Sequence, residues 1–216
     1  MSTLLSSQPL FGGAISLDLP QNSIDASDLR QIPNNQEVFL FPHSDTALVL
    51  EILEMVEEGG ARGDLWEAAK GCMDRFHFNS IAHDNASLDS TILTPAPPSP
   101  IPSSPSASPT ITPPQPVILS GTQRIHKFSH DPTGAPRPGH ENDVADDVWI
   151  GLALWRVWVE SDNGKKKKAD VVLSVNVNLS AADGSGEKER GQVEGWFGKA
   201  VGSLKVVDYG LFGDVE

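Results

Sequence analysis

Three glutamates that follow the tetrapeptide Pro42-His43-Ser44-Asp45 are the side chains best suited to binding a charged partner. The tetrapeptide and the later Gly59-Gly60 pair are typical of a helix start and a helix end, so the residues between them are predicted to form a helix. At about 100° per residue, acidic and apolar side chains fall on different faces of this helix. The acidic face comprises Glu51, Glu54 and Glu58, and the apolar stripe comprises Leu48, Val49, Ile52, Leu53 and Val56.

No basic residue on the predicted helix offsets its acidic face. Two interpretations remain open: a solvated face, which composition alone favours, or an acidic docking surface for a basic partner. Leu50 lies beside the acidic side chains on the helical wheel and would give such a surface an apolar anchor.

Residues that could catalyse a reaction or bind a metal ion are scattered along the chain. The six histidines show no metal-ligand spacing, and His126 and His130 lie four residues apart in a stretch whose pattern is extended rather than helical. Neither a G-x-S-x-G nucleophile elbow nor a phosphate-binding G-x-x-x-x-G-K-[ST] loop is present. Cys72 falls on the apolar face of a predicted helix, which indicates a core residue rather than a nucleophile. The sequence therefore predicts no catalytic residue, no cofactor and no metal site.

The charge of the 216-residue chain is strongly acidic and unevenly distributed. Twenty-nine acidic and sixteen basic residues give a formal net charge of −13, and residues 1–91 hold fourteen acids against four bases, a net charge of −10. This balance disfavours nucleic acids and anionic membranes as partners, since both attract clustered lysine and arginine. A single cysteine excludes an intramolecular disulfide framework, and neither a transmembrane segment nor a secretory signal is expected.

A proline-rich segment interrupts the chain. Ten of the seventeen prolines fall within residues 94–116, and no charged residue occurs from Ser90 to Gln123. We predict a disordered or polyproline-like Pro/Ser-rich insert over residues 94–116 within a single domain of residues 1–216. The simpler interpretation is a tolerated loop expansion. The alternative is a docking strip or phosphorylation platform, since Ser/Thr-Pro pairs suit proline-directed kinases and occur at Thr94, Ser99, Ser104, Ser108 and Thr112.

A run of four lysines, Lys165–Lys168, also has two interpretations. It is either a nuclear import signal or the charged, solvated tip of a hairpin, and the hairpin tip is the simpler of the two.

Hydrophobic periodicity predicts an α+β fold, in which a central antiparallel sheet is flanked by helices. The expected strands cover residues 11–19, 37–41, 117–128, 148–159, 171–179 and 205–209. Besides the helix that carries the glutamates, the expected helices cover residues 65–76 and 193–204.

Several sequence blocks resemble those of one known family. Residues 10–15 (LFGGAI), 24–33 (IDASDLRQIP) and 35–39 (NQEVF) look like the N-terminal signature of the Ran guanine nucleotide release factors, the Mog-type nuclear import proteins. The likeness continues at residues 76–82, 148–156, 170–177 and 206–208. It therefore covers nearly the whole chain apart from the proline-rich insert and the loop near residues 132–140.

The resemblance implies a PsbP-like fold, binding to the small GTPase Ran, promotion of guanine nucleotide release and a role in nuclear protein import. It further implies a monomer found in nucleus and cytoplasm that performs no covalent chemistry. Acidic residues of the family's Ran-binding surface fall on Glu51 and Glu54 in this chain. We expect the same surface to be bordered by Asp25, Arg30, Gln36 and Glu37.

Two other classes of function remain open at this stage. One is an adaptor that binds Ran or another basic partner without affecting the nucleotide. The other is a hydrolase or metal enzyme that uses the histidines.

Overall fold

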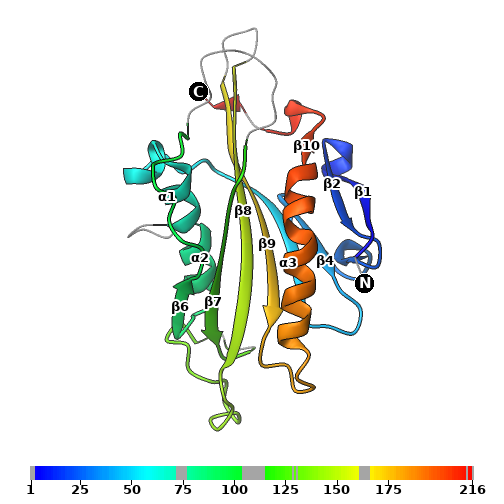
Figure 1. The fold of residues 1–216 in the computed structure, drawn as a ribbon, viewed down its shortest axis with the longest axis vertical. Coiled ribbons are helices and arrows are strands. Elements are labelled where there is room, and N and C mark those ends of the chain that lie inside the picture. The colour runs from blue at the N-terminus through cyan, green and yellow to red at the C-terminus, as the bar shows by residue number, and fades with distance from the viewer. Residues whose placement is uncertain are drawn as a thin grey trace.

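The computed structural model describes residues 3–71, 77–103, 115–127, 129, 131–160, 166–212 and 214–215. Within these residues, an eight-stranded antiparallel sheet forms the centre of the molecule (Figure 1). Its strand order is β3 (Ile24–Asp25), β4 (Gln36–Leu40), β5 (Ala47–Leu53), β9 (Lys166–Asn178), β8 (Asp146–Glu160), β7 (Val117–Ile125) and β6 (Asp89–Ile92), with β11 (Asp214–Val215) paired to β9. A smaller antiparallel sheet contains β1 (Leu5–Leu10), β2 (Ile15–Pro20) and β10 (Lys205–Val206).

Helices cover both faces of the large sheet. The long helix α3 (Gly186–Ser203) lies along one side of the β8–β9 hairpin, and α1 (Leu65–Lys70) and α2 (His77–Asp84) lie on the other side, near β6 and β7 (Figure 1). Short 3₁₀ helices complete the fold: η1 (Phe11–Gly13), η2 (Ala26–Asp28), η3 (Gly59–Arg62) and η4 (Tyr209–Leu211). This architecture confirms the predicted α+β class. None of the helices in the described part of the chain is long and apolar enough to cross a membrane.

The central strand β8 separates two hydrophobic cores. Trp155 and Val157 pack in the core that α3 covers, whereas Leu152 and Leu154 pack in the core that α1 and α2 cover. Successive side chains of a strand point to opposite faces of the sheet, so a strand between two cores must be apolar at nearly every position. This explains the continuous apolar run that predicted a central strand.

Gly121 of β7 allows α2 to approach the sheet closely. A Cβ atom at this position would lie 2.3 Å from Cζ of Phe78 and 2.5 Å from the carbonyl oxygen of Thr91. Phe78 is 1 % exposed and belongs to the core beneath α2. The glycine therefore provides the space into which α2 anchors its aromatic ring.

The prediction of a helix after Ser44 is wrong. Residues 47–53 form strand β5, which pairs with β4 on one side and β9 on the other. Leu48 and Leu50 point into the α3 core, whereas Glu51 and Leu53 point to the opposite face. A short apolar run fits both periodicities, and pairing with two neighbouring strands favours the extended form.

Other element boundaries differ in detail. The first predicted strand is divided, because Gly12 and Gly13 adopt φ angles of 66° and 94° within η1, and only β2 continues as a strand. Helix α3 begins at Gly186, earlier than predicted. The predicted helix over residues 65–76 is α1 as far as Lys70, and Cys72 lies outside the described residues.

The proline-rich segment and the lysine run are partly described. Residues 94–103 are in the described part, and residues 101–103 contact the turn before α1. Residues 104–114 lie outside it.

In the lysine run, Lys168 pairs with Glu57 at 2.8 Å and lies over the ring of Trp158, and Lys167 donates to the carbonyl oxygen of Phe212.

A buried ion pair links β8 and β9 to the loop that follows β5. Arg156 donates from Nε and Nη2 to the two carboxylate oxygens of Asp170, at 2.8 and 2.9 Å. Its remaining donors bind the carbonyl oxygens of Ala61 and Val56 at 2.7 and 2.8 Å. Asp170 also accepts from the Val56 amide and lies 3.1 Å from Nε2 of His77. These contacts connect two strands, one loop and one helix at a single point.

We predict that Asp170→Asn destabilises the protein by about 3–5 kcal/mol, because it leaves the Arg156 guanidinium buried without a counter-charge. Urea unfolding at pH 7 measures the change. The exposed Arg124–Asp147 pair, 3.0 Å apart, provides the control. Asp147→Asn should leave the unfolding midpoint nearly unchanged, because solvent screens that pair. An equal effect of the two substitutions would contradict the importance assigned to Asp170.

The contribution of Asp170 should also depend on pH. Burial by itself raises the pKa of this carboxyl, but hydrogen bonds from Arg156 and His77 and the charge of Arg156 outweigh it, so the pKa lies below its ordinary value. Stabilisation is therefore present above the unfolded-state pKa of about 3.9 and is lost as pH falls through the folded-state pKa. The difference in stability between wild type and Asp170→Asn should shrink in acid.

Candidate functional site

A hollow of about 230 Å³ lies between the end of β5 and helix α2. Its walls contain both carboxylates and apolar side chains. The lining residues are Glu51, Leu53, Glu54, Val56, His77, Ser80, Ile81, Asp84 and Val172. A cation with an aliphatic stem could make contacts of both kinds in such a space.

The three carboxylates of the hollow have no lysine or arginine partner among the described residues. Glu51 accepts a hydrogen bond from Nε2 of Gln36, its neighbour across the β4–β5 pair. Glu54 makes no hydrogen bond or ion pair within the described part of the chain. Within the described ranges, the one polar partner of the Asp84 carboxylate is the exposed ring of its neighbour His83, at 3.4 Å. The nearby Glu57, by contrast, is neutralised by Lys168. Among the described residues, the hollow is therefore a local concentration of negative charge that no lysine or arginine compensates.

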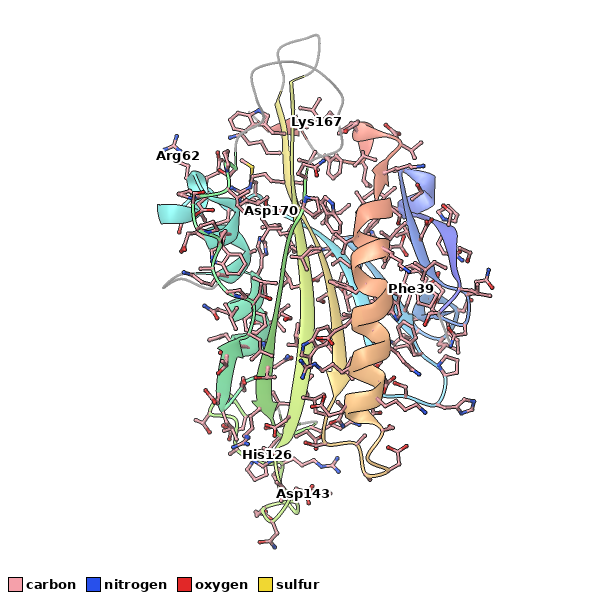
Figure 2. All side chains as sticks on the ribbon, viewed as in Figure 1. Phe39, Arg62, His126, Asp143, Lys167 and Asp170 are labelled. Atoms are coloured by element: carbon pink, nitrogen blue, oxygen red, sulfur yellow. The ribbon has the colours of Figure 1, made fainter. Side chains whose placement is uncertain are left out.

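The buried ion pair fixes the two sides of the hollow relative to each other. On the β5 side, both the amide and the carbonyl group of Val56 bind the Arg156–Asp170 pair, which holds the loop that carries Glu54. On the α2 side, His77 lies against Asp170 and is only 5 % exposed. Figure 2 shows Asp170 in the upper half of the sheet, at the opposite end from His126 and Asp143.

The structure brings some of the predicted site residues together. Glu51 and Glu54 line the same hollow, and Gln36 lies beside Glu51. Glu58 is exposed at the start of η3 and does not line the hollow. Leu50 is fully buried in the α3 core, so the prediction of an exposed apolar anchor at this position is wrong. The strand geometry that points Glu51 outward necessarily points Leu50 inward.

The remaining predicted residues lie elsewhere on β3, β4 and the turn that follows β3. The side chain of Glu37 points to the opposite face from Gln36 and accepts a hydrogen bond from the Phe11 amide at 2.5 Å. Asp25 caps η2 through the Ser27 amide at 2.8 Å. Arg30 is exposed just beyond η2. These three residues therefore do not line the hollow.

Sequence reasoning did not identify His77, Ser80 and Asp84 as site residues. They are 26 to 33 positions from Glu51 in the sequence, and only the packing of α2 on the sheet places them beside β5. No local motif could have indicated this, since the contact depends on Gly121 and on the buried Asp170.

The histidines in the described part of the chain do not converge on one site. His77 is buried against Asp170, whereas His126 and His140 line a separate hollow of about 290 Å³ at the other end of the sheet, together with Asp143 and Asp146. Within the described ranges, no group of three or more His, Cys, Asp or Glu side chains is arranged to hold a metal ion.

Comparison with known proteins identifies the family of this chain. The model of the family described as "Ran-interacting Mog1 protein" matches residues 8–178. The chain belongs to this family. The hollow thus lies in a member of the Mog1 family, within the matched residues.

Individual Mog1 relatives support this assignment. The Ran guanine nucleotide release factor of Homo sapiens is 48 % identical over 73 residues, which cover 34 % of each chain. The nuclear import protein mog1 of Schizosaccharomyces pombe is 44 % identical over 77 residues, 35 % of this chain and 36 % of that one. These two alignments therefore span only about a third of each relative. The probable ran guanine nucleotide release factor of Dictyostelium discoideum is 24 % identical over 230 residues, 98 % of both chains.

A solved Mog1 structure supports the fold. The Ran-binding protein Mog1p of Saccharomyces cerevisiae superposes with a TM-score of 0.64 at 24 % identity, over 98 % of this chain and 100 % of that one.

We predict that His77→Ala loosens α2 without unfolding the Mog1 domain. The substitution removes the contact between α2 and Asp170 but leaves the Arg156–Asp170 pair intact. Loss of one hydrogen bond of about 1 kcal/mol should accelerate amide hydrogen exchange in α2 roughly fivefold. His83→Ala, at an exposed position on the same helix, is the control and should leave the exchange rates unchanged. Equal exchange in both variants would show that His77 does not hold the helix.

Proposed function

We propose that the chain binds the small GTPase Ran and promotes release of its guanine nucleotide. Membership of the Ran-interacting Mog1 family and the names of the relatives support this proposal. The structural observation that carries it is the hollow lined by Glu51, Glu54 and Asp84, whose carboxylates have no lysine or arginine partner in the described part of the chain. A surface of this kind complements a basic patch on a partner protein.

The docking surface consists of the rim of this hollow. Glu51 and Glu54 supply the charge, and the hydrogen bond from Gln36 orients the Glu51 carboxylate. Glu58 extends the charge toward η3, while Asp25 and Arg30 lie toward the β3 edge of the sheet. Glu37 contributes indirectly, by fixing the hairpin that carries Phe11.

No covalent chemistry is needed for nucleotide release. If the protein binds nucleotide-free Ran more tightly than nucleotide-bound Ran, the nucleotide must bind the complex more weakly by the same factor. The free energy of docking therefore lowers nucleotide affinity. In a cell, this activity would act in nuclear protein import, in agreement with the names of the yeast relatives.

A nucleotide-release assay tests the proposal. Ran loaded with a fluorescent guanine nucleotide is mixed with the protein and excess unlabelled nucleotide, and the loss of fluorescence is followed. The wild type should accelerate release, and Glu51→Lys/Glu54→Lys should reduce the acceleration at least about tenfold, equivalent to roughly 1.4 kcal/mol. Acceleration should also fall with added salt, since exposed charges are screened.

The control variant is Glu187→Lys/Glu194→Lys, which makes the same change of charge on exposed positions of α3, across the sheet from the hollow. It should retain the activity of the wild type. If the control variant accelerates release as weakly as the hollow variant does, the loss of activity is caused by the change in net charge alone. Binding of Ran by the wild type without any acceleration would instead identify an adaptor.

A further inference from the structure

The segment of residues 93–103, here called the strap, runs from its contact with β7 to the turn before α1. One end is fixed to β7, because the amides of Leu93 and Thr94 donate to the carbonyl oxygen of Ser120 at 2.7 and 3.2 Å. The other end is fixed at Ile101, whose amide donates to Oδ1 of Asp64 at 3.0 Å and whose carbonyl oxygen accepts from the Leu65 amide at 2.8 Å. Residues 95–100 between these ends make no hydrogen bond with other residues that the structure describes.

The strap contains two Ser/Thr-Pro pairs with different environments. The Thr94 hydroxyl is half-buried and accepts a hydrogen bond from the Ser120 amide at 2.7 Å, with the Ser120 hydroxyl 3.2 Å away. The Ser99 hydroxyl is exposed and has no hydrogen-bond partner among the described residues, and Pro100 follows it. A kinase must bind its substrate in an extended form and place the hydroxyl beside its catalytic aspartate. Only Ser99 meets this requirement without breaking existing bonds.

We propose that Ser99 is a phosphorylation site for a proline-directed protein kinase, and that Thr94 is protected by its bonds to β7. In the reaction, the Ser99 Oγ forms a bond to the γ-phosphorus of ATP as the bond from that phosphorus to the β–γ bridging oxygen breaks. ADP leaves, and the hydroxyl proton passes to the kinase aspartate.

Phosphorylation of Ser99 would act on the end of the strap that is fixed at Ile101. Ser99 lies two residues before Ile101, so their Cα atoms are at most about 7 Å apart. Asp64 accepts from both Ile101 and Trp66, and thereby holds the strap and caps α1. A phosphate carries a charge of about −1.5 to −2 at pH 7, and on Ser99 it would repel the Asp64 carboxylate, which binds Ile101 two residues further along. The modification therefore loosens the contact between the strap and α1.

Site mapping in the full-length protein tests the proposal. The protein carries Ser104→Ala, Ser108→Ala and Thr112→Ala, so that the Ser/Thr-Pro pairs left in the proline-rich segment are those at Thr94 and Ser99. It is incubated with a cyclin-dependent kinase, Mg²⁺ and ATP, and phosphopeptides are quantified by mass spectrometry. Ser99 should be phosphorylated at least about tenfold faster than Thr94, and Ser99→Ala should abolish this incorporation. Equal rates at the two residues, or no phosphate on Ser99, would overturn the proposal.

Hydrogen exchange of the phosphorylated protein tests the consequence. The Leu65 amide, which donates to Ile101, should exchange at least about threefold faster than in the unmodified protein. Exchange in α3 should stay unchanged and serves as the internal control. An unchanged rate at Leu65 would overturn the loosening of the strap.

Discussion

The buried pair of Arg156 and Asp170 is the constraint on which the end of the molecule that contains the acidic hollow depends. A guanidinium and a carboxylate can be buried only if their hydrogen bonds are satisfied, and here the remaining donors and acceptors bind Ala61, Val56 and His77. The requirement to satisfy this pair therefore fixes the loop after β5 and the start of α2. The walls of the acidic hollow are positioned by the same contacts, which links the stability of the core to the shape of the proposed docking surface.

The structure shows where part of the net charge of −13 lies. Several surface carboxylates are paired, as Glu57 is with Lys168 and Asp45 with Lys127, and the latter pairing lowers the pKa of Asp45. Among the described residues, Glu51 and Glu54 have no such lysine or arginine partner. Leaving like charges close together without compensation has a cost in stability, and a basic partner would remove that cost on binding.

Much of the fold could be predicted from the sequence, because alternation in residues 171–179 and the apolar run in residues 148–159 each suit one kind of strand. The identity of β5 could not, since Leu48 to Leu53 satisfy a helical wheel as well as an alternating strand. Only the pairing of Leu50 with Leu173 decides between them. Glu51 and Glu54 were identified as neighbours for the wrong structural reason, because a strand followed by a sharp loop brings them together as a helix would. Asp84 and His77 required tertiary packing, which no local pattern encodes.

The most direct test of the docking surface is a nuclear magnetic resonance titration of ¹⁵N-labelled protein with Ran. The amide signals of residues 51–56 and of α2 should shift or broaden first, while those of α3 and of the β1–β2 hairpin should remain unchanged. Perturbation confined to α3 or to the β1–β2 hairpin, with no change at β5 or α2, would contradict the assignment of the acidic hollow as the site where the partner binds.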